Sequence, residues 1–482
     1  MATTLQNPAT AFPDGLRRDT PSSVGVDASQ ILGFIDDVEA AELELHELMI
    51  WRDGAVVAEG WHWPYVADER RITHSVTKSI TACAIGMLID DGQLSLTDKV
   101  CRFFPEVEVA PDSPIARMTV EDLLTMRSGQ GSEVSGSIWR GITTSWIDEF
   151  FRIPLDHEPG TVYVYSSASS YMLSAIVTRV TGETMFDFLK PRLFEPLGIT
   201  DVTWDVGPDG LNPGGNGLSL TTADSLKIGI LHAQNGVWGG QRILSEWWVA
   251  RATGTIEGVP NYGYHWVVRD GYYMALGQFV QVIMVVPAFN AVLVINCAME
   301  ESKVLLPHLD RHFPAAFGGK VDSDADQRLA RRLKDWAAAP AFPSSAMGDG
   351  ASFTGDWTFD ANDLGLSSLS LSFAPQEMRF SLTDGEGKHT VVAGLDSWKK
   401  APSYLPGATL HHGYRMEATP TVAGARWLAG NRLEIVLHYT ESAFRDTITL
   451  SVDDDRLTMD RAVNINSGAR AWPTLTATRK AA

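Results

Sequence analysis

A serine and a lysine three residues apart are the residues of this sequence best suited to covalent chemistry. Ser75 and Lys78 lie near the start of HSVTKSITACAIGMLIDDG, residues 74–92. Apolar residues recur in this segment at spacings of three and four, and we predict a buried helix that ends at Gly92. Because residues three apart share one face of a helix, the Lys78 amine can lie beside the Ser75 hydroxyl.

A lysine amine in this position could activate the serine. A serine hydroxyl is a poor nucleophile until another group accepts its proton. A lysine can accept that proton if burial and nearby cations lower its pKa towards neutrality. The N-terminus of the helix also favours the negative charge that develops on the serine oxygen. The pair therefore has the chemistry of a nucleophile, Ser75, and its base, Lys78.

The Ser-x-x-Lys spacing needs support from its surroundings, because on the order of one match is expected by chance in a chain of this length. Ser397 and Lys400 form a second match, in a strand-rich part of the sequence. Residues three apart in a strand point to opposite faces, so we exclude that pair.

Sequence blocks that occur in a fixed order around Ser75 support a functional reading of the Ser-x-x-Lys spacing. RDGAVVAEGW precedes the helix, and DGQLSLTDKVCRFFPE, MTVEDLLTMRSG, EPGTVYVYSSASSYMLSAIVTRVTGET, FEPLGIT and GGNGLSLTTADSLKIGILHAQNG follow it. From about residue 20 to 310 the chain resembles the β-lactamase-related serine hydrolases. This family includes class C β-lactamases, penicillin-binding proteins, D-alanyl peptidases, esterases and 6-aminohexanoate-dimer hydrolases. The resemblance implies that Ser75 is acylated during turnover and that Lys78 activates it.

The family's second motif is Tyr-x-Asn, and its counterpart falls in PGTVYVYSSASSY. Tyr165 fits best, with Tyr163 as the alternative. The resemblance implies that the Tyr165 hydroxyl passes protons between nucleophile, leaving group and water, which requires nearby cations that lower its pKa. Ser166 and Ser167 replace x-Asn, so recognition of a β-lactam side chain by that amide is not expected.

The family's third motif, Lys-Thr-Gly or His-x-Gly, corresponds to Ala275-Leu276-Gly277. Gly277 is expected to leave the strand edge open to substrate. The backbone N–H near Gln278, together with that of Ser75, is expected to form the oxyanion hole. Ala275 supplies no cation for a substrate carboxylate, which favours other esters or amides. Substrate-binding residues are therefore predicted to be Gly277, Gln278, Ser167 and Trp266. Trp139, Trp146 and Tyr264 are further candidates for an apolar acyl pocket, with a place in the core as their alternative.

The elements that must position these residues come from both ends of the first domain. Two strand-like runs flank the turn at Asp53-Gly54, and three more follow residue 262, with helices and loops between. This order predicts one sheet assembled from both ends with a helical insert beside it. The fold class is α/β, in the form of an α+β sandwich: an antiparallel sheet flanked by helices plus a helical subdomain. The resemblance identifies it as β-lactamase/transpeptidase-like.

The pattern of the sequence changes after about residue 338, and this change predicts a second domain. Residues 324–338 form a charged amphipathic helix, and 339–351 is a linker rich in Pro, Gly, Ser and Ala. Short alternating runs divided by turn residues then fill 352–482, which predicts an all-β barrel-like domain or a sandwich. We therefore expect a hydrolase domain over 1–338, a linker over 339–351 and a β domain over 352–482 that contributes no catalytic group.

Composition excludes several classes of partner. The formal net charge is −20, which argues against nucleic acid and anionic membranes. The three cysteines are widely spaced and indicate a reducing compartment. Without an apolar leader or a long apolar run, a cytoplasmic location is expected. The partners expected are a small-molecule ester or amide substrate and, as an open alternative, a second copy in a homodimer.

We expect no cofactor and no metal. His46-Glu47 lacks the second histidine of HExxH, and His411-His412 lies in a predicted strand that would point the two rings apart. The acidic run from Asp322 to Asp326 lacks the glycine and the closing glutamate of an EF-hand. No GxSxG elbow occurs, which excludes an α/β-hydrolase.

The function predicted is hydrolysis of esters or amides through an acyl-enzyme on Ser75, activated by Lys78 and Tyr165. The alternatives are a β-lactamase or D-alanyl peptidase proper, and an inactive binding protein of the same fold. The joint presence of serine, lysine and tyrosine disfavours the inactive protein, since a decayed site would readily lose one of them.

Overall fold

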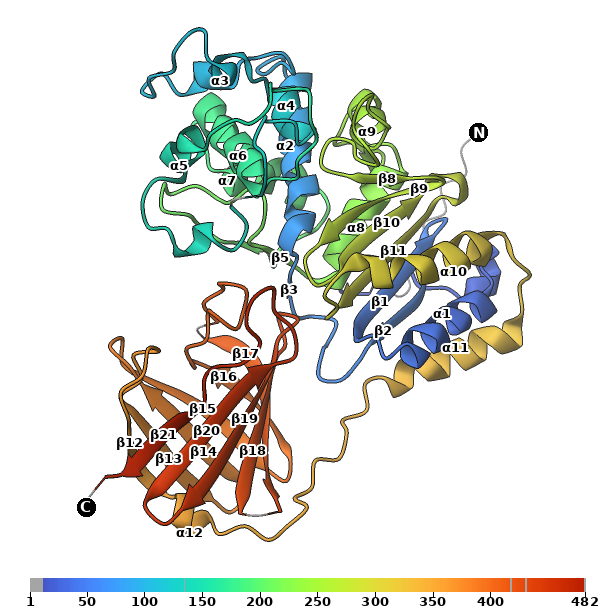
Figure 1. Cartoon of the computed structure of the whole chain (residues 1–482). Helices are drawn as coiled ribbons and strands as arrows, with labels where there is room; N and C mark the ends of the chain where they lie inside the picture. The colour runs from blue at the N-terminus through green and yellow to red at the C-terminus, as the bar shows by residue number, and fades with distance from the viewer. Residues whose placement is uncertain (1–11, 134, 417, 430, 481–482) are drawn as a thin grey trace. The chain divides into compact units, whose positions relative to one another are not determined.

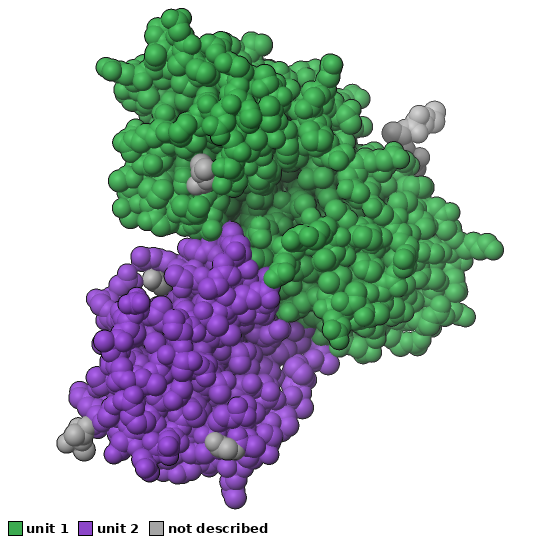
Figure 2. Space-filling view, viewed as in Figure 1, with its two compact units in different colours: residues 1–62, 67–336 green, residues 63–66, 337–482 purple. Residues whose placement is uncertain are grey.

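The chain forms two compact units in the computed structural model, which describes residues 12–133, 135–416, 418–429 and 431–480. The first unit comprises 1–62 and 67–336, and the second comprises 63–66 and 337–482 (Figure 2). The short segment Trp63–Val66 thus belongs to the second unit although it lies within the sequence of the first.

The first unit is organised by an antiparallel sheet whose strands come from both ends of its sequence (Figure 1). The strand order is β2-β1-β11-β10-β9-β8. The bounds are β1 Leu45–Arg52, β2 Ala55–Trp61, β8 Val267–Arg269, β9 Tyr272–Gly277, β10 Gln281–Val286 and β11 Ala291–Cys297. The hairpin at Asp53-Gly54 joins β1 to β2, with both residues at positive φ. The predicted antiparallel sheet, assembled from both ends of the unit's sequence, is confirmed.

Apolar side chains project from both faces of this sheet, because successive residues of a strand point to opposite sides. On one face, Leu48 and Ile50 join a core with helices α1, α10 and α11. On the other, Met49 and Trp51 join a core that includes helix α8. The helices span α1 Ala28–Ala40, α8 Thr222–Ala233, α10 Leu306–Gly318 and α11 Ser323–Asp335. Helix α8 lies so close that a Cβ on its Gly229 would meet Val292 at 2.4 Å.

A helical region beside the sheet contains the predicted nucleophile helix. Its helices are α2 Thr77–Asp90, α3 Pro114–Arg117, α4 Val120–Leu124, α5 Trp146–Arg152, α6 Ser167–Thr181, α7 Met185–Leu189 and α9 Glu246–Ala252. Every residue of α2 from Thr77 to Leu88 is buried, which explains why apolar and small residues fill it. Its final turn is closed by Gly92, whose N–H donates to the carbonyl of Ile89 at positive φ. A small sheet in the order β3-β5-β4 joins this region to the rest of the unit. Its strands are β3 Arg71–Ile72, β4 Thr203–Trp204 and β5 Leu218–Leu220.

The second unit is a closed β-barrel, which confirms the barrel predicted from alternating short runs. Its neighbouring strands run β15-β14-β13-β12-β21-β20-β19-β18-β17, pairing of β15 with β17 closes the ring, and β16 pairs with β17. Short helix α12, Gly350–Phe353, precedes them. The strands are β12 Gly355–Phe359, β13 Ser368–Ala374, β14 Glu377–Thr383, β15 Lys388–Leu395, β16 Trp398–Ser403, β17 Thr419–Leu428, β18 Arg432–Tyr439, β19 Arg445–Asp453, β20 Arg456–Val463 and β21 Leu475–Arg479.

A buried charge cluster ties a loop to this barrel. Asp446 accepts hydrogen bonds from Arg461 Nε at 2.9 Å and pairs with His411 Nε2 at 2.8 Å. All three side chains are fully buried. Burial opposes ionisation of Asp446, but the attraction of His411 and Arg461 outweighs it and lowers the pKa of Asp446 to about 2. The carboxylate is therefore the charge on which this cluster depends.

We expect Asp446→Ala to destabilise the barrel by about 3–5 kcal/mol, because it leaves a buried guanidinium without its counter-charge. Asp360→Ala is the matched control, since Asp360 forms an exposed pair with Arg456 and its loss should hardly change the melting temperature. The wild-type contribution of Asp446 is fully present above its ordinary pKa near 3.8 and is lost as pH falls towards 2. Thermal unfolding of the three proteins between pH 2 and pH 7 measures this; equal melting temperatures for both variants would contradict it.

Candidate active site

Ser75 lies in a 3-10 turn, His74–Val76, between β3 and α2. His74 adopts φ 48, a left-handed conformation that is uncommon for residues other than glycine. The turn is held to β5, because the N–H and the hydroxyl of Thr73 both donate to the carbonyl of Leu218. The ring of His74 packs edge-on against Phe279 at 5.3 Å between centroids. The position of Ser75 is therefore set from both sides of the turn.

The Lys78 amine is buried and faces three oxygen atoms. Its Nζ donates to Ser75 Oγ at 3.0 Å, Ser167 Oγ at 3.0 Å and the Gly215 carbonyl at 2.9 Å. The residue is 1% exposed. Burial lowers the pKa of Lys78 to about 7; the Glu133 carboxylate opposes this and the charge of Arg140 adds to it. A substantial fraction of Lys78 is therefore neutral near pH 7, as a general base requires.

Tyr165 contacts the same serine from another direction. Its hydroxyl hydrogen-bonds with Ser75, and Lys78 Nζ lies 4.8 Å from the centroid of its ring. Burial raises the pKa of Tyr165 above its ordinary value, and the Ser75 hydrogen bond only reduces that rise. The expectation that cations lower this pKa is therefore wrong: Tyr165 is a phenol that keeps its proton.

Tyr163 has a different environment. Its ring packs against Tyr262 at 5.5 Å between centroids, and burial raises its pKa to about 12. It lines the same pocket as Ser75, but it is Tyr165 that hydrogen-bonds the serine.

The two serines that replace x-Asn begin helix α6 and have separate contacts. Ser166 is buried and its hydroxyl donates to Gln130 Oε1 at 2.7 Å. Ser167 presents its hydroxyl to Lys78, and its N–H donates to Glu133 Oε2 at 2.6 Å. Sequence reasoning missed Glu133, because a single acidic residue in a loop carries no recognisable pattern.

The end of β9 approaches the nucleophile turn more closely than the sequence indicates. A Cβ on Gly277 would lie 2.5 Å from the backbone oxygen of Thr73. The glycine is thus required for contact with the turn that holds Ser75, rather than only for an open edge. Phe279 and Val280 follow at φ 62 and φ 70, which is strained for a β-branched residue such as Val280. Strain at a hairpin next to a nucleophile is typical of functional sites.

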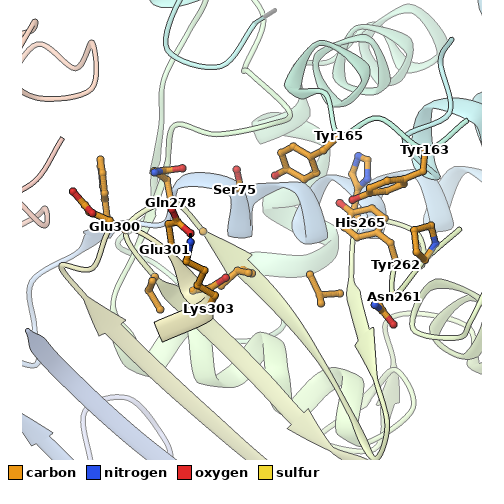
Figure 3. Close-up of a pocket in the computed structure, with 17 residues that line it drawn as sticks. Ser75, Tyr163, Tyr165, Asn261, Tyr262, His265, Gln278, Glu300, Glu301 and Lys303 are labelled. Atoms are coloured by element: carbon orange, nitrogen blue, oxygen red, sulfur yellow. Dashed lines mark ion pairs between the residues drawn. The ribbon is translucent and has the colours of Figure 1, made fainter. Parts of the chain in front are cut away.

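A pocket of about 610 Å³ contains Ser75 between two walls of different chemistry (Figure 3). Tyrosines and a histidine form one wall, and charged residues form the other. The first wall contains Tyr163, Tyr165, Tyr262 and His265; the second contains Glu300, Glu301 and Lys303. Gly277 and Gln278 also line the pocket. Sequence reasoning missed the charged wall, because its residues follow β11 in an ordinary polar loop.

Several of the residues predicted to bind substrate do not line this pocket. Ser167 contacts Lys78 instead, and the alternative place in the core holds for Trp139, Trp146 and Tyr264, which are buried.

Trp266 is fully buried, and its ring packs against His232 and Tyr273 at 4.5 and 5.3 Å between centroids. Its assignment to substrate binding is therefore wrong, since Tyr262, not Trp266, faces the cavity from the same loop. Ala275 is also buried and pairs with Ile283 across β10, so its side chain does not line the pocket.

The remaining polar candidates have structural partners. His46 contacts Glu44 and Arg71, and His411 contacts Asp446. Asp322 caps α11 by accepting from the N–H of Asp324. The residues that the structure describes contain no group of three or more potential metal ligands. In the same part of the chain, no helix has the length and apolar character needed to cross a membrane.

Comparison with known proteins identifies the family of this chain. The family model described as Beta-lactamase matches residues 39–303, which is more than half of the chain. The chain belongs to the β-lactamase family. This family and the named relatives below are hydrolases of the serine β-lactamase fold.

This family member is 30% identical over 207 residues to the lovastatin esterase of Penicillium rubens, covering 38% of this chain and 51% of that protein. It is 26% identical over 279 residues to the 6-aminohexanoate-dimer hydrolase of Paenarthrobacter ureafaciens, covering 53% of this chain and 71% of that protein. The match to the esterase thus spans about half of that relative's length. The solved structure of SurE, 18% identical with a TM-score of 0.51, covers 88% of this chain and 98% of that chain. At that identity the likeness shows the fold alone.

Replacement of Gly277 by alanine tests the contact between β9 and the nucleophile turn. The added methyl group would meet the Thr73 backbone, so we expect a loss of about 1–3 kcal/mol of stability. Gly141→Ala is the control, because no atom lies within 4 Å of a Cβ at that position. Urea denaturation of both variants measures the difference; an unchanged midpoint for Gly277→Ala would show that the strand can move aside at no cost.

Proposed function

We propose that this β-lactamase-family member hydrolyses small esters or amides through an acyl-enzyme on Ser75. The observation that carries the proposal is the hydrogen bond of 3.0 Å from Lys78 Nζ to Ser75 Oγ. It joins a serine at the edge of a pocket to an amine whose pKa burial lowers to about 7. A hydroxyl within hydrogen-bond distance and a pKa close to neutrality are both what a base for serine needs.

In the first half of the reaction, Ser75 Oγ attacks the substrate carbonyl carbon. Its proton passes to neutral Lys78 as the new carbon–oxygen bond forms. The negative charge on the carbonyl oxygen is stabilised by the backbone N–H groups of Ser75 and Gln278, which line the pocket. The Tyr165 phenol then protonates the leaving group as its bond to carbon breaks, and Lys78 returns a proton to Tyr165.

In the second half, water attacks the acyl-enzyme. One proton of the water passes to neutral Lys78, and the bond between the acyl carbon and Ser75 Oγ breaks. Tyr165 and Lys78 together restore the proton to the serine. The raised pKa of Tyr165 suits this donor role, because the phenol stays protonated between steps. The Lys78 ammonium near its ring can stabilise the phenolate that forms briefly.

The pocket supports a small-molecule substrate. Its volume of about 610 Å³ lies within the range of pockets for small ligands. The names of two relatives, an esterase and a hydrolase of 6-aminohexanoate dimers, support an ester or an amide as the bond that is cleaved. Without a cation at the third motif, a carboxylate-bearing substrate lacks the partner that β-lactams need there.

A β-lactamase or D-alanyl peptidase is the second candidate, and one residue favours it. Lys303 lines the pocket and could supply the positive charge that Ala275 lacks. Its amine forms an ion pair with Glu301, however, and its side chain is 74% exposed. An exposed and already paired amine adds little binding energy for a carboxylate, so we favour neutral esters and amides.

The catalytic assignment predicts that a fluorophosphonate labels Ser75 at a rate that rises through about pH 7, where the basic form of Lys78 becomes populated. We expect no labelling in Ser75→Ala, and about a hundred- to ten-thousand-fold slower ester turnover in Lys78→Ala and Tyr165→Phe. Ser397→Ala and Tyr163→Phe are the matched controls, as the unused serine of the second Ser-x-x-Lys match and the tyrosine that does not bond Ser75. Labelling that persists in Ser75→Ala would refute the assignment, and a large loss in Tyr163→Phe alone would transfer the proton relay to that residue.

The charged wall predicts slow hydrolysis of nitrocefin relative to p-nitrophenyl esters. A missing charge-assisted hydrogen bond is worth about 1.5–3 kcal/mol, or roughly ten- to a hundred-fold in binding. Glu301→Gln releases Lys303 from its ion pair and should raise kcat/KM for nitrocefin without raising it for neutral esters. Nitrocefin hydrolysis faster than ester hydrolysis in the wild type, and abolished by Lys303→Ala, would establish the second candidate instead.

A further inference from the structure

His265 occupies an unusual position beside the proposed catalytic residues. It lines the pocket with Ser75 and yet is only 2% exposed (Figure 3). Its backbone adopts φ 62, a left-handed conformation that is strained for a residue other than glycine. Such a conformation persists when the surroundings fix the residue, and strained residues concentrate at functional sites. Nothing in the sequence around YGYHW distinguished it from a core histidine.

The contacts of His265 join the two helices that carry the proposed base and its partner. Its carbonyl accepts a hydrogen bond from Ser79 Oγ at 2.6 Å, and Ser79 follows Lys78 on α2. Its ring Nε2 hydrogen-bonds with Ser170 Oγ at 3.0 Å. Ser170 lies three residues after Ser167 on α6, so both serines share one face of that helix. A single residue thus links α2 next to Lys78 with α6 next to Ser167.

The direction in which the Lys78 amine points depends on the spacing between α2 and α6. Its three hydrogen bonds reach Ser75 Oγ before α2, Ser167 Oγ on α6 and the carbonyl of Gly215. An ammonium has three donors, so all of them are directed to fixed acceptors. A shift of α6 by a few tenths of an ångström would lengthen the bond to Ser167 and free the amine to turn away from Ser75.

We propose that His265 is a positioning residue that fixes α2 against α6 and thereby holds the Lys78 amine on Ser75. This inference rests on the proposed hydrolase function of that site. His265 acts through the base and needs no contact with the substrate.

The charge state of His265 suits this role. Burial, and then the positive charge of Lys78, lower the pKa of His265 to about 3, so the imidazole is neutral at any pH where Lys78 can act as a base. The ring therefore lies within the range of the Lys78 charge without adding a second positive charge there. The other charges that act on Lys78 are those of Glu133 and Arg140, and neither belongs to the loop of His265. Loss of the ring would admit water, reduce the desolvation of the amine and raise the pKa of Lys78.

The variant His265→Gly separates positioning from simple packing. Glycine adopts φ 62 without strain, and it retains the carbonyl that accepts from Ser79. Only the ring and its bond to Ser170 are removed. Ser170→Ala removes the same bond from the other side and keeps the ring. Ser174→Ala is the matched control, because its buried hydroxyl lies on the same helix and donates to the Asn212 carbonyl instead.

The test is the rate at which a fluorophosphonate labels Ser75 from pH 5 to pH 9, together with thermal stability, in these variants and in the double variant His265→Gly/Ser170→Ala. In His265→Gly we expect the rising limb to move upwards by about one pH unit, which is about tenfold in the neutral fraction of Lys78 below the limb. Ser170→Ala should slow labelling in the same pH range, and the double variant should be no slower than His265→Gly. Ser174→Ala should keep the wild-type profile.

The outcomes separate this inference from the proposed function. Wild-type pH profiles and rates in both His265→Gly and Ser170→Ala would overturn the positioning role and leave Ser75 as the nucleophile. The same result in Ser170→Ala alone would suffice if His265→Gly did not fold. Equal slowing by Ser174→Ala would also overturn it, because any lost hydroxyl on α6 would then have the same effect. Failure of the wild type to label at Ser75 would refute the hydrolase function itself.

Discussion

The desolvation of one amine is the constraint on which the site depends. Lys78 is 1% exposed and lies among three oxygen acceptors, and without water its ammonium form is less favoured. That loss brings its pKa to about 7. The hydrogen bonds fix where the amine points, while burial makes a neutral form available. A site open to water could keep the geometry, but it would leave the lysine protonated.

Several elements that lie far apart in the sequence are needed to keep the Lys78 amine buried. The strands β3 and β5 hold the turn of Ser75, and α6 brings Ser167. The end of β9 closes on Thr73, which only a glycine at position 277 allows. The left-handed residues His74, Phe279 and His265 all lie at this junction. Backbone strain therefore collects where these elements meet, which is expected if tertiary contacts, and not local preference, determine the conformation there.

Sequence reasoning succeeded where the signal is local and periodic. The three-residue spacing of Ser75 and Lys78 and the alternation of the barrel strands are both read from short windows, and both have structural counterparts. It failed where tertiary packing chooses between neighbours. Trp266 and Tyr262 lie in one loop with similar chemistry, but only the tyrosine reaches the pocket. Residues such as His265 and Lys303 come from loops without a pattern, so no periodicity could have selected them. The pKa of Tyr165 was misjudged for a related reason: the extent of its burial is a property of the folded unit.

The segment Trp63–Val66 limits how the two units can be separated. It lies between β2 and β3, on the stretch of chain that leads to Ser75, yet the ring of Trp63 packs against Trp398 and His438 of the barrel at 4.6 and 5.2 Å between centroids. The chain therefore passes between the units more than once, and the barrel is not a simple appendage to the C-terminus. A barrel attached only at the C-terminal end would lack these ring contacts, since Trp63 comes from inside the hydrolase sequence. Exchange of barrels between family members would have to carry this internal segment along with the tail.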